Sequence, residues 1–218
     1  AVIVQDGLRR MYEQGEEIFY YITLYNETQL MPPMPENVTE GIVKGLYRFQ
    51  KAPKRAKLKA HLLGSGPLIR DALRAQEMLA ERYGVEADVW SATSYNELRR
   101  GALEAERWNR LHPAAAPKTP YVREILGREK GVFVAVSDYM KIVADQIAPW
   151  VPGGLVSLGT DGFGRSDTRQ NLRRFFEVDA EMIVIAVLHA LSGHGEVPGE
   201  TVAKAIRDLG VDPDKRHS

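Results

Sequence analysis

Apolar and polar residues follow one another along this chain in a pattern that predicts alternating strands and helices. Four short apolar runs are typical of buried strands, at residues 58–63, 85–90, 132–136 and 155–158. Apolar residues recur at helical spacing over residues 67–83, between the first two runs. A strand, a helix and a strand of this length form a βαβ unit, so these two strands are expected to be parallel. The whole order predicts an α/β fold, a three-layer sandwich in which helices flank a mostly parallel sheet.

Capping residues mark the start of further helices. A capping box at residues 94–97 predicts a helix that continues to about residue 111. Residues 137–138 are expected to cap a short helix after the third strand, and Asp179 a helix over residues 180–191. A last helix is predicted by apolar residues at helical spacing, Val202, Ile206 and Leu209.

The beginning of the chain has a different character. Residues 2–4 and 18–24 are rich in β-branched and aromatic residues, which predicts strands, and residues 8–12 are expected to be helical. Because the chain starts inside an apparent strand, we expect it to be a piece of a longer protein.

A proline-rich stretch follows at residues 31–36. Its three prolines predict an extended linker, because proline cannot continue a helix or a central strand. We therefore expect two units, the end of one domain and its linker at residues 1–36 and a second domain at residues 37–218. The second domain is expected to open with a helix over residues 39–49.

A glycine-rich motif at residues 158–167 is the most distinctive feature of the chain. Its three glycines, at positions 159, 162 and 164, indicate positive φ or a close backbone approach. Ser166 or Asp167 is expected to cap the helix that follows. A strand, a tight turn and a helix N-terminus together favour an anion site or a partner surface.

This motif departs by one residue from a phosphate-binding P-loop. Gly159, Gly164 and Ser166 have the required spacing, but Arg165 stands where that loop has lysine. Arginine differs from the compact ammonium that reaches the β- and γ-phosphates. Two interpretations stay open: a structural strand-to-helix turn, and an autonomous anion- or nucleotide-binding α/β module built on the turn at residues 159–166.

Composition narrows the function classes. Among 218 residues, Lys+Arg 29 balance Asp+Glu 29, so no global field favours nucleic acid or a membrane surface. The absence of cysteine excludes disulfides, thiolate metal sites and cysteine nucleophiles. No apolar run approaches the ~20 residues that a membrane span needs, and we expect a cytoplasmic protein. Basic residues concentrate at 51–59, which is compatible with a phosphate site or a solvated loop.

The histidines have no metal-binding spacing, and His112, which precedes a proline in a loop, is the candidate among them for a functional group. The alternative for His112 is a histidine at the surface or at an interface.

A set of motifs extends in order over nearly the whole chain. They are YYIT at 20–23, NE at 26–27, MPPMPE at 31–36, LLGSG at 62–66, DVWSATS at 88–94, ERWN at 106–109, LHP at 111–113, SDYMK at 137–141, LGTDGFGRSD at 158–167, NLR at 171–173 and FEVD at 176–179. Together these motifs resemble the homodimeric, bacterial type of the thiamine-dependent pyruvate dehydrogenase, the decarboxylating component of the pyruvate dehydrogenase complex.

The resemblance implies a division of labour between domains. Residues 37–218 look like the transketolase-like C-terminal domain, and residues 1–36 like the end of the pyrimidine-binding domain with its linker. The intact enzyme would be a homodimer that decarboxylates pyruvate on thiamine diphosphate with magnesium and then acetylates lipoyl groups of the acetyltransferase core. The family's cofactor motif, G-D-G followed by N-N, does not occur here. By itself the chain is therefore expected to bind neither thiamine diphosphate nor metal, to contain no catalytic residue and to be inactive.

For such a domain, the resemblance implies a role in structure, in dimerisation and in the approach to the active site. Residues that we expect at a channel or interface are Asn26, Glu27, His112, Asp161, Phe163, Arg165 and Asp167. The alternative is that Asp161 pairs with Arg165 to hold the turn, while Asp167 or Ser166 only caps a helix. The apolar helix faces at residues 175–176 and 182–183 are expected in the core or at a dimer contact.

Overall fold

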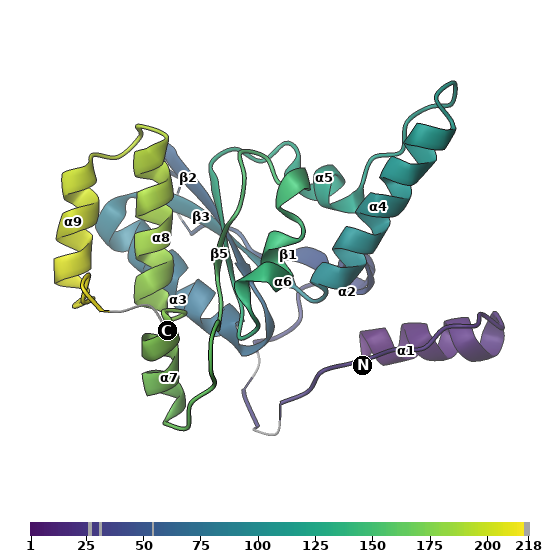
Figure 1. Ribbon diagram of the computed structural model, residues 1–218, viewed down its shortest axis with the longest axis horizontal. Coiled ribbons are helices and arrows are strands. Elements are labelled where there is room, and N and C mark those ends of the chain that lie inside the picture. Colours follow the sequence, from purple (N-terminus) through teal and green to yellow (C-terminus); the bar gives the residue numbers. More distant parts are fainter. Residues whose placement is uncertain (26–27, 31, 54, 216–218) are drawn as a thin grey trace.

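One sheet forms the centre of the computed structural model, which describes residues 1–25, 28–30, 32–53 and 55–215. Its strand order is β1-β3-β2-β4-β5 (Figure 1). β2 to β5 are parallel, and β1 pairs with β3 in the opposite direction, so the expected mostly parallel sheet is confirmed. The strands are β1 (Leu46–Gln50), β2 (Leu58–Gly64), β3 (Val85–Ala92), β4 (Val132–Val136) and β5 (Val156–Leu158).

Helices connect these strands. In chain order they are α1 (Val2–Leu8), α2 (Thr39–Lys44), α3 (Ile69–Met78), α4 (Tyr95–Leu111), α5 (Tyr121–Leu126), α6 (Lys141–Asp145), α7 (Arg169–Phe176), α8 (Ala180–Gly193) and α9 (Gly199–Asp208). Short 3-10 or π-helical segments are present at Arg9–Glu13, Gly66–Leu68, Leu79–Tyr83 and Ala148–Trp150. Within the described part of the chain, no helix combines the length and the hydrophobicity that crossing a membrane requires.

The helices lie on both faces of the sheet and make three layers (Figure 1). α3, α8 and α9 cover one face, where Leu62 of β2 and Ile183 of α8 belong to the same buried cluster. α4, α5 and α6 cover the other face, where Leu63, Trp90 and Phe133 are buried together. Neighbouring residues of β2 therefore point to opposite faces, as the pleat of a strand requires. The predicted three-layer α/β sandwich is confirmed.

Most predicted elements are present. The four apolar runs form β2 to β5, and residues 67–83 are helical throughout. Ser94 Oγ accepts a hydrogen bond from the amide of Glu97 at 3.1 Å, so the capping box is confirmed. Asp179 caps α8 in the same way, because its Oδ1 accepts from the amide of Met182 at 2.9 Å.

The predicted helix over residues 39–49 is wrong beyond Lys44. α2 ends at Lys44, and the next residue, Gly45, has a φ of 104°, a conformation that side chains disfavour. The chain then enters β1, where Leu46 is fully buried and lies opposite Ala92 of β3. Burial against a neighbouring strand overrides a local apolar spacing that also fits a helix.

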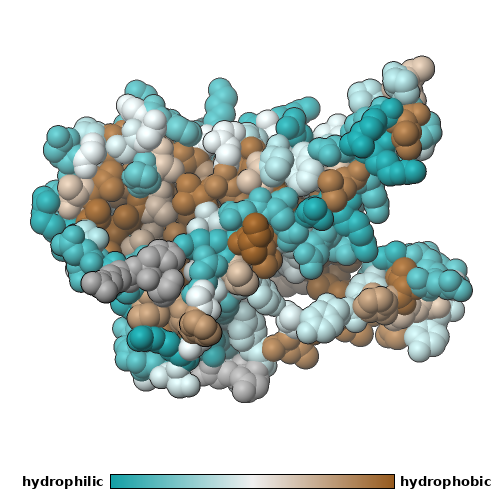
Figure 2. Space-filling model, in the orientation of Figure 1, coloured by the Kyte–Doolittle hydropathy of each residue, from teal (hydrophilic) through white to brown (hydrophobic). Residues whose placement is uncertain are grey.

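Two strand predictions near the N-terminus are also wrong. Residues 2–4 lie in α1, and residues 18–24 are extended but pair with no strand among the described residues. A preference for strands reflects packing on a pleated, half-buried surface, and neither stretch pairs with a described strand of the sheet. Phe19, Tyr21 and Leu24 are instead 88%, 88% and 87% exposed. Figure 2 shows apolar side chains at the surface over α1 and the extended segment beside it.

The predicted cap of α6 is wrong as well. α6 begins at Lys141, directly after Met140, so residues 137–138 precede it by several positions. Ser137 Oγ accepts a hydrogen bond from the amide of Tyr139 at 3.0 Å. These polar residues therefore shape a turn between β4 and α6 rather than the end of a helix.

Candidate functional site

The carboxyl ends of the parallel strands meet along one edge of the sheet. From β2 the chain continues to β3 on one side, whereas β4 lies on the other side of β2. Such a divergence is where α/β folds form a ligand-binding crevice. Residues 65–66 follow β2, residues 137–141 follow β4 and residues 159–161 follow β5, so these three turns lie at this edge. The glycine-rich motif is therefore located where this fold class places its functional residues.

Gly159 allows the motif to approach the turn after β4 closely. A Cβ at this position would lie 2.6 Å from the carbonyl oxygen of Tyr139 and 2.7 Å from the amide nitrogen of Lys141. The amide of Thr160 donates to that same carbonyl of Tyr139 at 2.8 Å. Because both neighbours are backbone atoms, only glycine fits without displacement of one turn.

Asp161 also contacts the turn after β4. Its Oδ1 accepts a hydrogen bond from the amide of Lys141 at 3.1 Å, and its Oδ2 lies 3.7 Å from Lys141 Nζ. The guanidinium of Arg165 lies instead over the ring of Phe175, 4.0 Å from the ring centroid. The pairing of Asp161 with Arg165, expected as one alternative, is therefore wrong.

Thr168, rather than Ser166 or Asp167, caps α7. Its Oγ1 accepts from the amide of Asn171 at 3.3 Å. Asp167 braces the cap from outside, because its Oδ1 accepts from Asn171 Nδ2 at 2.9 Å and from the amide of Thr168 at 2.6 Å. These hydrogen bonds lower the pKa of Asp167, and the bond from the Asn171 side chain has the largest effect. The helix thus begins farther from Gly164 than in a P-loop, which argues against the nucleotide-binding interpretation.

The rest of the motif faces solvent. Phe163 is 97% exposed. The residues after Phe163 line a pocket of about 320 Å³. Its lining residues are Arg165, Ser166, Asp167, Asn171, Leu172 and Phe175. The loop thus presents an aromatic ring, a guanidinium and a carboxylate to solvent, a combination suited to contact with another surface. Phe176 and Ile183 are buried, which supports the core interpretation for these two residues.

Other residues expected at the site lie elsewhere. His112 follows α4, whose far end projects from the body of the molecule (Figure 1). Its ring stacks on that of Trp108 at 3.7 Å, and its Nδ1 lies 3.0 Å from the carbonyl oxygen of Trp108. Asn26 and Glu27 lie outside the described residues. Among the expected residues that the structure describes, Asp161, Phe163, Arg165 and Asp167 share the loop of the glycine-rich motif, whereas His112 lies apart from it.

Residues 18–25, which we call the N-terminal segment, also reach this edge, although the sequence did not indicate it. Tyr25 OH donates to Asp138 Oδ2 at 3.0 Å, and Thr23 Oγ1 lies 2.5 Å from Tyr139 OH. Burial, followed by the nearby charge of Asp138, raises the pKa of Tyr25. The polar residues directly after β4 were the available signal, since carboxyl ends of strands collect functional groups.

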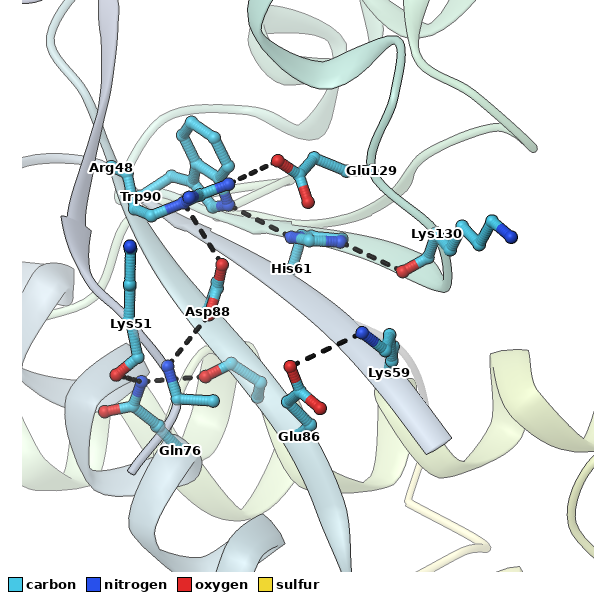
Figure 3. Close-up of polar contacts among 12 residues, drawn as sticks. Arg48, Lys51, Lys59, His61, Gln76, Glu86, Asp88, Trp90, Glu129 and Lys130 are labelled. Atoms are coloured by element: carbon cyan, nitrogen blue, oxygen red, sulfur yellow. Dashed lines mark hydrogen bonds and ion pairs between the residues drawn. The ribbon is translucent and has the colours of Figure 1, made fainter. Parts of the chain in front are cut away.

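A second polar cluster, drawn in Figure 3, lies beside Trp90 and Phe133 on the face of the sheet that carries α4. Glu129 and Lys130 precede β4, so the cluster lies toward the amino end of that strand. His61, Asp88 and Glu129 have ligand atoms within 4.8 Å of one another, which is the composition of a cation site. The guanidinium of Arg48 already binds both carboxylates, with Nε 3.1 Å from Asp88 Oδ2 and Nη2 paired to Glu129. An arginine side chain therefore supplies the positive charge of this cluster.

His61 has both ring nitrogens engaged. Its Nδ1 accepts from Trp90 Nε1 at 3.2 Å, and its Nε2 lies 3.1 Å from the carbonyl oxygen of Lys130, to which it donates (Figure 3). The ring is buried and stacks on Phe133 at 4.6 Å. Burial lowers the pKa of His61, so the neutral form is favoured. A neutral histidine that accepts from tryptophan and donates to a carbonyl has no lone pair left for a metal.

The basic stretch at residues 51–59 lies beside carboxylates. Asp88 accepts from the amide of Ala52 at 2.8 Å, and Glu86 accepts from the amide of Ala56 at 3.0 Å. Lys54 lies outside the described residues. Because carboxylates hold the ends of this loop, a phosphate site here is disfavoured.

Two family models match this chain. The model of the transketolase-like TK C-terminal domain matches residues 45–179, and the model of the pyruvate dehydrogenase E1 component middle domain matches residues 1–32. The chain is 49% identical over all its residues to the pyruvate dehydrogenase E1 component of Pseudomonas aeruginosa, of which it covers 25%. It is 48% identical over 99% of its length to that of Escherichia coli K12, of which it covers 24%, and 47% identical over 97% to that of Mycobacterium tuberculosis, of which it covers 23%.

Solved structures support the fold. A transketolase from Pichia stipitis superposes with a TM-score of 0.51 at 16% identity, over 78% of this chain and 21% of that one. A transketolase from Leishmania mexicana gives a TM-score of 0.50 at 19% identity, over 74% and 20%. The chain spans about a quarter of the length of the curated relatives that it matches. It belongs to the family of transketolase-like C-terminal domains.

Proposed function

We propose that this chain is the C-terminal part of a thiamine-diphosphate-dependent pyruvate dehydrogenase E1 component. The main support is the 49% identity to such a component over the whole chain. In the intact protein we infer oxidative decarboxylation of pyruvate and reductive acetylation of lipoyl groups on the acetyltransferase core. We infer a cytoplasmic homodimer that binds neither nucleic acid nor membrane.

We infer that thiamine diphosphate and magnesium bind outside this chain. The described residues do not fit them: the cluster of His61, Asp88 and Glu129 contains the guanidinium of Arg48, and the histidine nitrogens are engaged. The chain on its own is therefore proposed to be inactive, and no catalytic step is assigned to its residues.

The role that we propose for this domain is assembly and the shaping of the approach to the active site. The division into residues 1–36 and 37–218 follows the proline-rich linker. Phe163 is the main support for a role in the approach to the active site. An aromatic ring that is 97% exposed in a tightly anchored loop contributes little to folding. Asp161, Arg165 and Asp167 place charges on the same loop.

The test is Phe163→Ala in the intact enzyme. Loss of a contact that aids the reaction should lower kcat/KM for pyruvate, or for the lipoyl acceptor, by roughly 5- to 30-fold, which corresponds to about 1 to 2 kcal/mol. The melting temperature should stay unchanged, because the ring is exposed. Leu103→Ala, which truncates an exposed apolar side chain of α4, is the matched control.

Arg165→Ala separates the two interpretations of the motif. Unchanged kinetics in both Phe163→Ala and Arg165→Ala, with a lower melting temperature only for the latter, would show that the loop is structural. Arg165 would then act only through its contact with Phe175.

A further inference from the structure

The turn at residues 137–141, which we call the coupling turn, lies between the N-terminal segment and the glycine-rich motif. On one side its side chains bind the N-terminal segment: Asp138 accepts from Tyr25 OH at 3.0 Å, and Tyr139 OH lies 2.5 Å from Thr23 Oγ1. These contacts join residues more than a hundred positions apart in the chain.

On the other side, the backbone of the coupling turn binds the motif. The carbonyl of Tyr139 accepts from the amide of Thr160 at 2.8 Å, and the amide of Lys141 donates to Asp161 at 3.1 Å. Tyr139 thus contacts the N-terminal segment through its hydroxyl and the motif through its carbonyl. Both contacts belong to one residue, so a displacement of the Tyr139 ring beyond its rotamer well also strains the backbone that holds the motif.

Tyr25 also packs on the turn after β2. A Cβ on Gly66 would lie 2.9 Å from Tyr25 OH and 3.2 Å from its ring, so the phenol rests against bare backbone. Ser65, at the other side of this turn, donates its amide to the carbonyl of Val136 at the end of β4 at 3.0 Å. The tyrosine is therefore held between the turn after β2 and Asp138.

We propose that the N-terminal segment sets the position of the glycine-rich motif through the coupling turn, with Tyr25 and Tyr139 as positioning residues. The segment follows the π-helical residues Arg9–Glu13 and is tied back to α1, because Tyr20 OH donates to Asp6 Oδ2 at 2.6 Å. A shift of the unit that contains α1 is thereby transmitted to Thr160 and Asp161. The inference does not depend on the role of the motif in the reaction.

Hydrogen exchange in the intact protein tests this coupling. Tyr25→Phe keeps the ring and removes only the bond to Asp138. If the coupling turn then moves more freely, the amide of Thr160 should exchange roughly 2- to 10-fold faster, the range expected for the loss of one hydrogen bond. Tyr21→Phe is the matched control, since this tyrosine lies on the same segment and is 88% exposed.

Amides in the middle of α8 serve as the reference for global stability. Faster exchange at Thr160 with unchanged exchange in α8 supports the coupling. Equal exchange at Thr160 in Tyr25→Phe and Tyr21→Phe overturns it, as does an increase that α8 shares in full. A second variant, Tyr139→Phe, should reproduce the effect of Tyr25→Phe, and the double variant should show less than the product of the two single effects, because both act through one turn. This experiment measures hydrogen exchange, whereas the Phe163→Ala test measures kcat/KM. A negative result in either experiment therefore leaves the other proposal standing.

Discussion

Removal of the Arg48 side chain is the sharpest test of the polar cluster in Figure 3. In Arg48→Ala, Asp88 and Glu129 lose their shared cation, and the ring of Trp90 loses a guanidinium whose centre lies 4.5 Å from the ring centroid. The carboxylates then stand close together near His61, in an environment that holds the histidine neutral.

The magnitude follows from the exposure of the three side chains. Breaking a fully buried ion pair costs about 3 to 5 kcal/mol, because an unpaired charge remains. Here the side chains of Arg48, Asp88 and Glu129 are 29%, 15% and 29% exposed, and Asp88 keeps the amide of Ala52 as a donor. We therefore expect a loss of about 2 to 3 kcal/mol, which for a chain of this size lowers the melting temperature by roughly 4 to 12 °C.

Urea unfolding followed by tryptophan fluorescence measures the loss directly, since Trp90 belongs to the cluster. Arg100→Ala is the control: its pair with Glu97 is 58% and 39% exposed and should contribute less than about 1 kcal/mol. A loss below about 1 kcal/mol in Arg48→Ala would refute the reasoning. So would a rise in the melting temperature of the unaltered chain on addition of Zn²⁺ that His61→Gln abolishes, because a metal would then occupy the cluster in place of the guanidinium.

Two further predictions concern single positions. Gly159→Ala should cost about 2 to 4 kcal/mol in urea unfolding, because the new methyl group meets backbone atoms of Tyr139 and Lys141; a loss below about 0.5 kcal/mol would mean that the turns separate freely. Since burial lowers the pKa of His61 below 6.5, the unfolded chain takes up the proton first, and stability should fall as the pH drops from 6.5 toward the folded-state pKa. His61→Gln should show a smaller fall in urea midpoint between about pH 7.5 and about pH 5.5, and an equal fall would assign the pH dependence to other groups.

The central strands of the sheet could be predicted from the sequence, whereas β1 and the N-terminal residues could not. β2 to β5 are short apolar runs bounded by turn residues, and such runs have few other solutions in an α/β chain. β1 was missed because its residues also fit helical spacing, and only pairing with β3, a strand distant in the sequence, decides between the two. Residues 18–24 have the composition of a strand, but a strand forms only beside another strand.

For the candidate site, local signals were informative and distant ones absent. The spacing of the glycines located the motif. However, Asp161 binds Lys141 and Arg165 packs on Phe175, whereas the sequence had suggested that the two bind each other. These contacts depend on where β4 and α7 lie in the fold, and residue spacing carries no information about that. The contacts of Thr23 and Tyr25 with the coupling turn are likewise products of tertiary structure.

The two borders of the sheet bear on how this protein avoids aggregation. At one border β5 has only three residues, and at the other the pairing of β1 with β3 shifts register between Arg48 and Gln50. Short or irregular edge strands present few unpaired N–H and C=O groups in a regular row. A strand of a second molecule therefore has little backbone with which to pair. The longest strands, β2 and β3, lie inside the sheet, where they are paired on both sides. The parts of the sheet most able to template misassembly are thereby kept out of reach of other molecules.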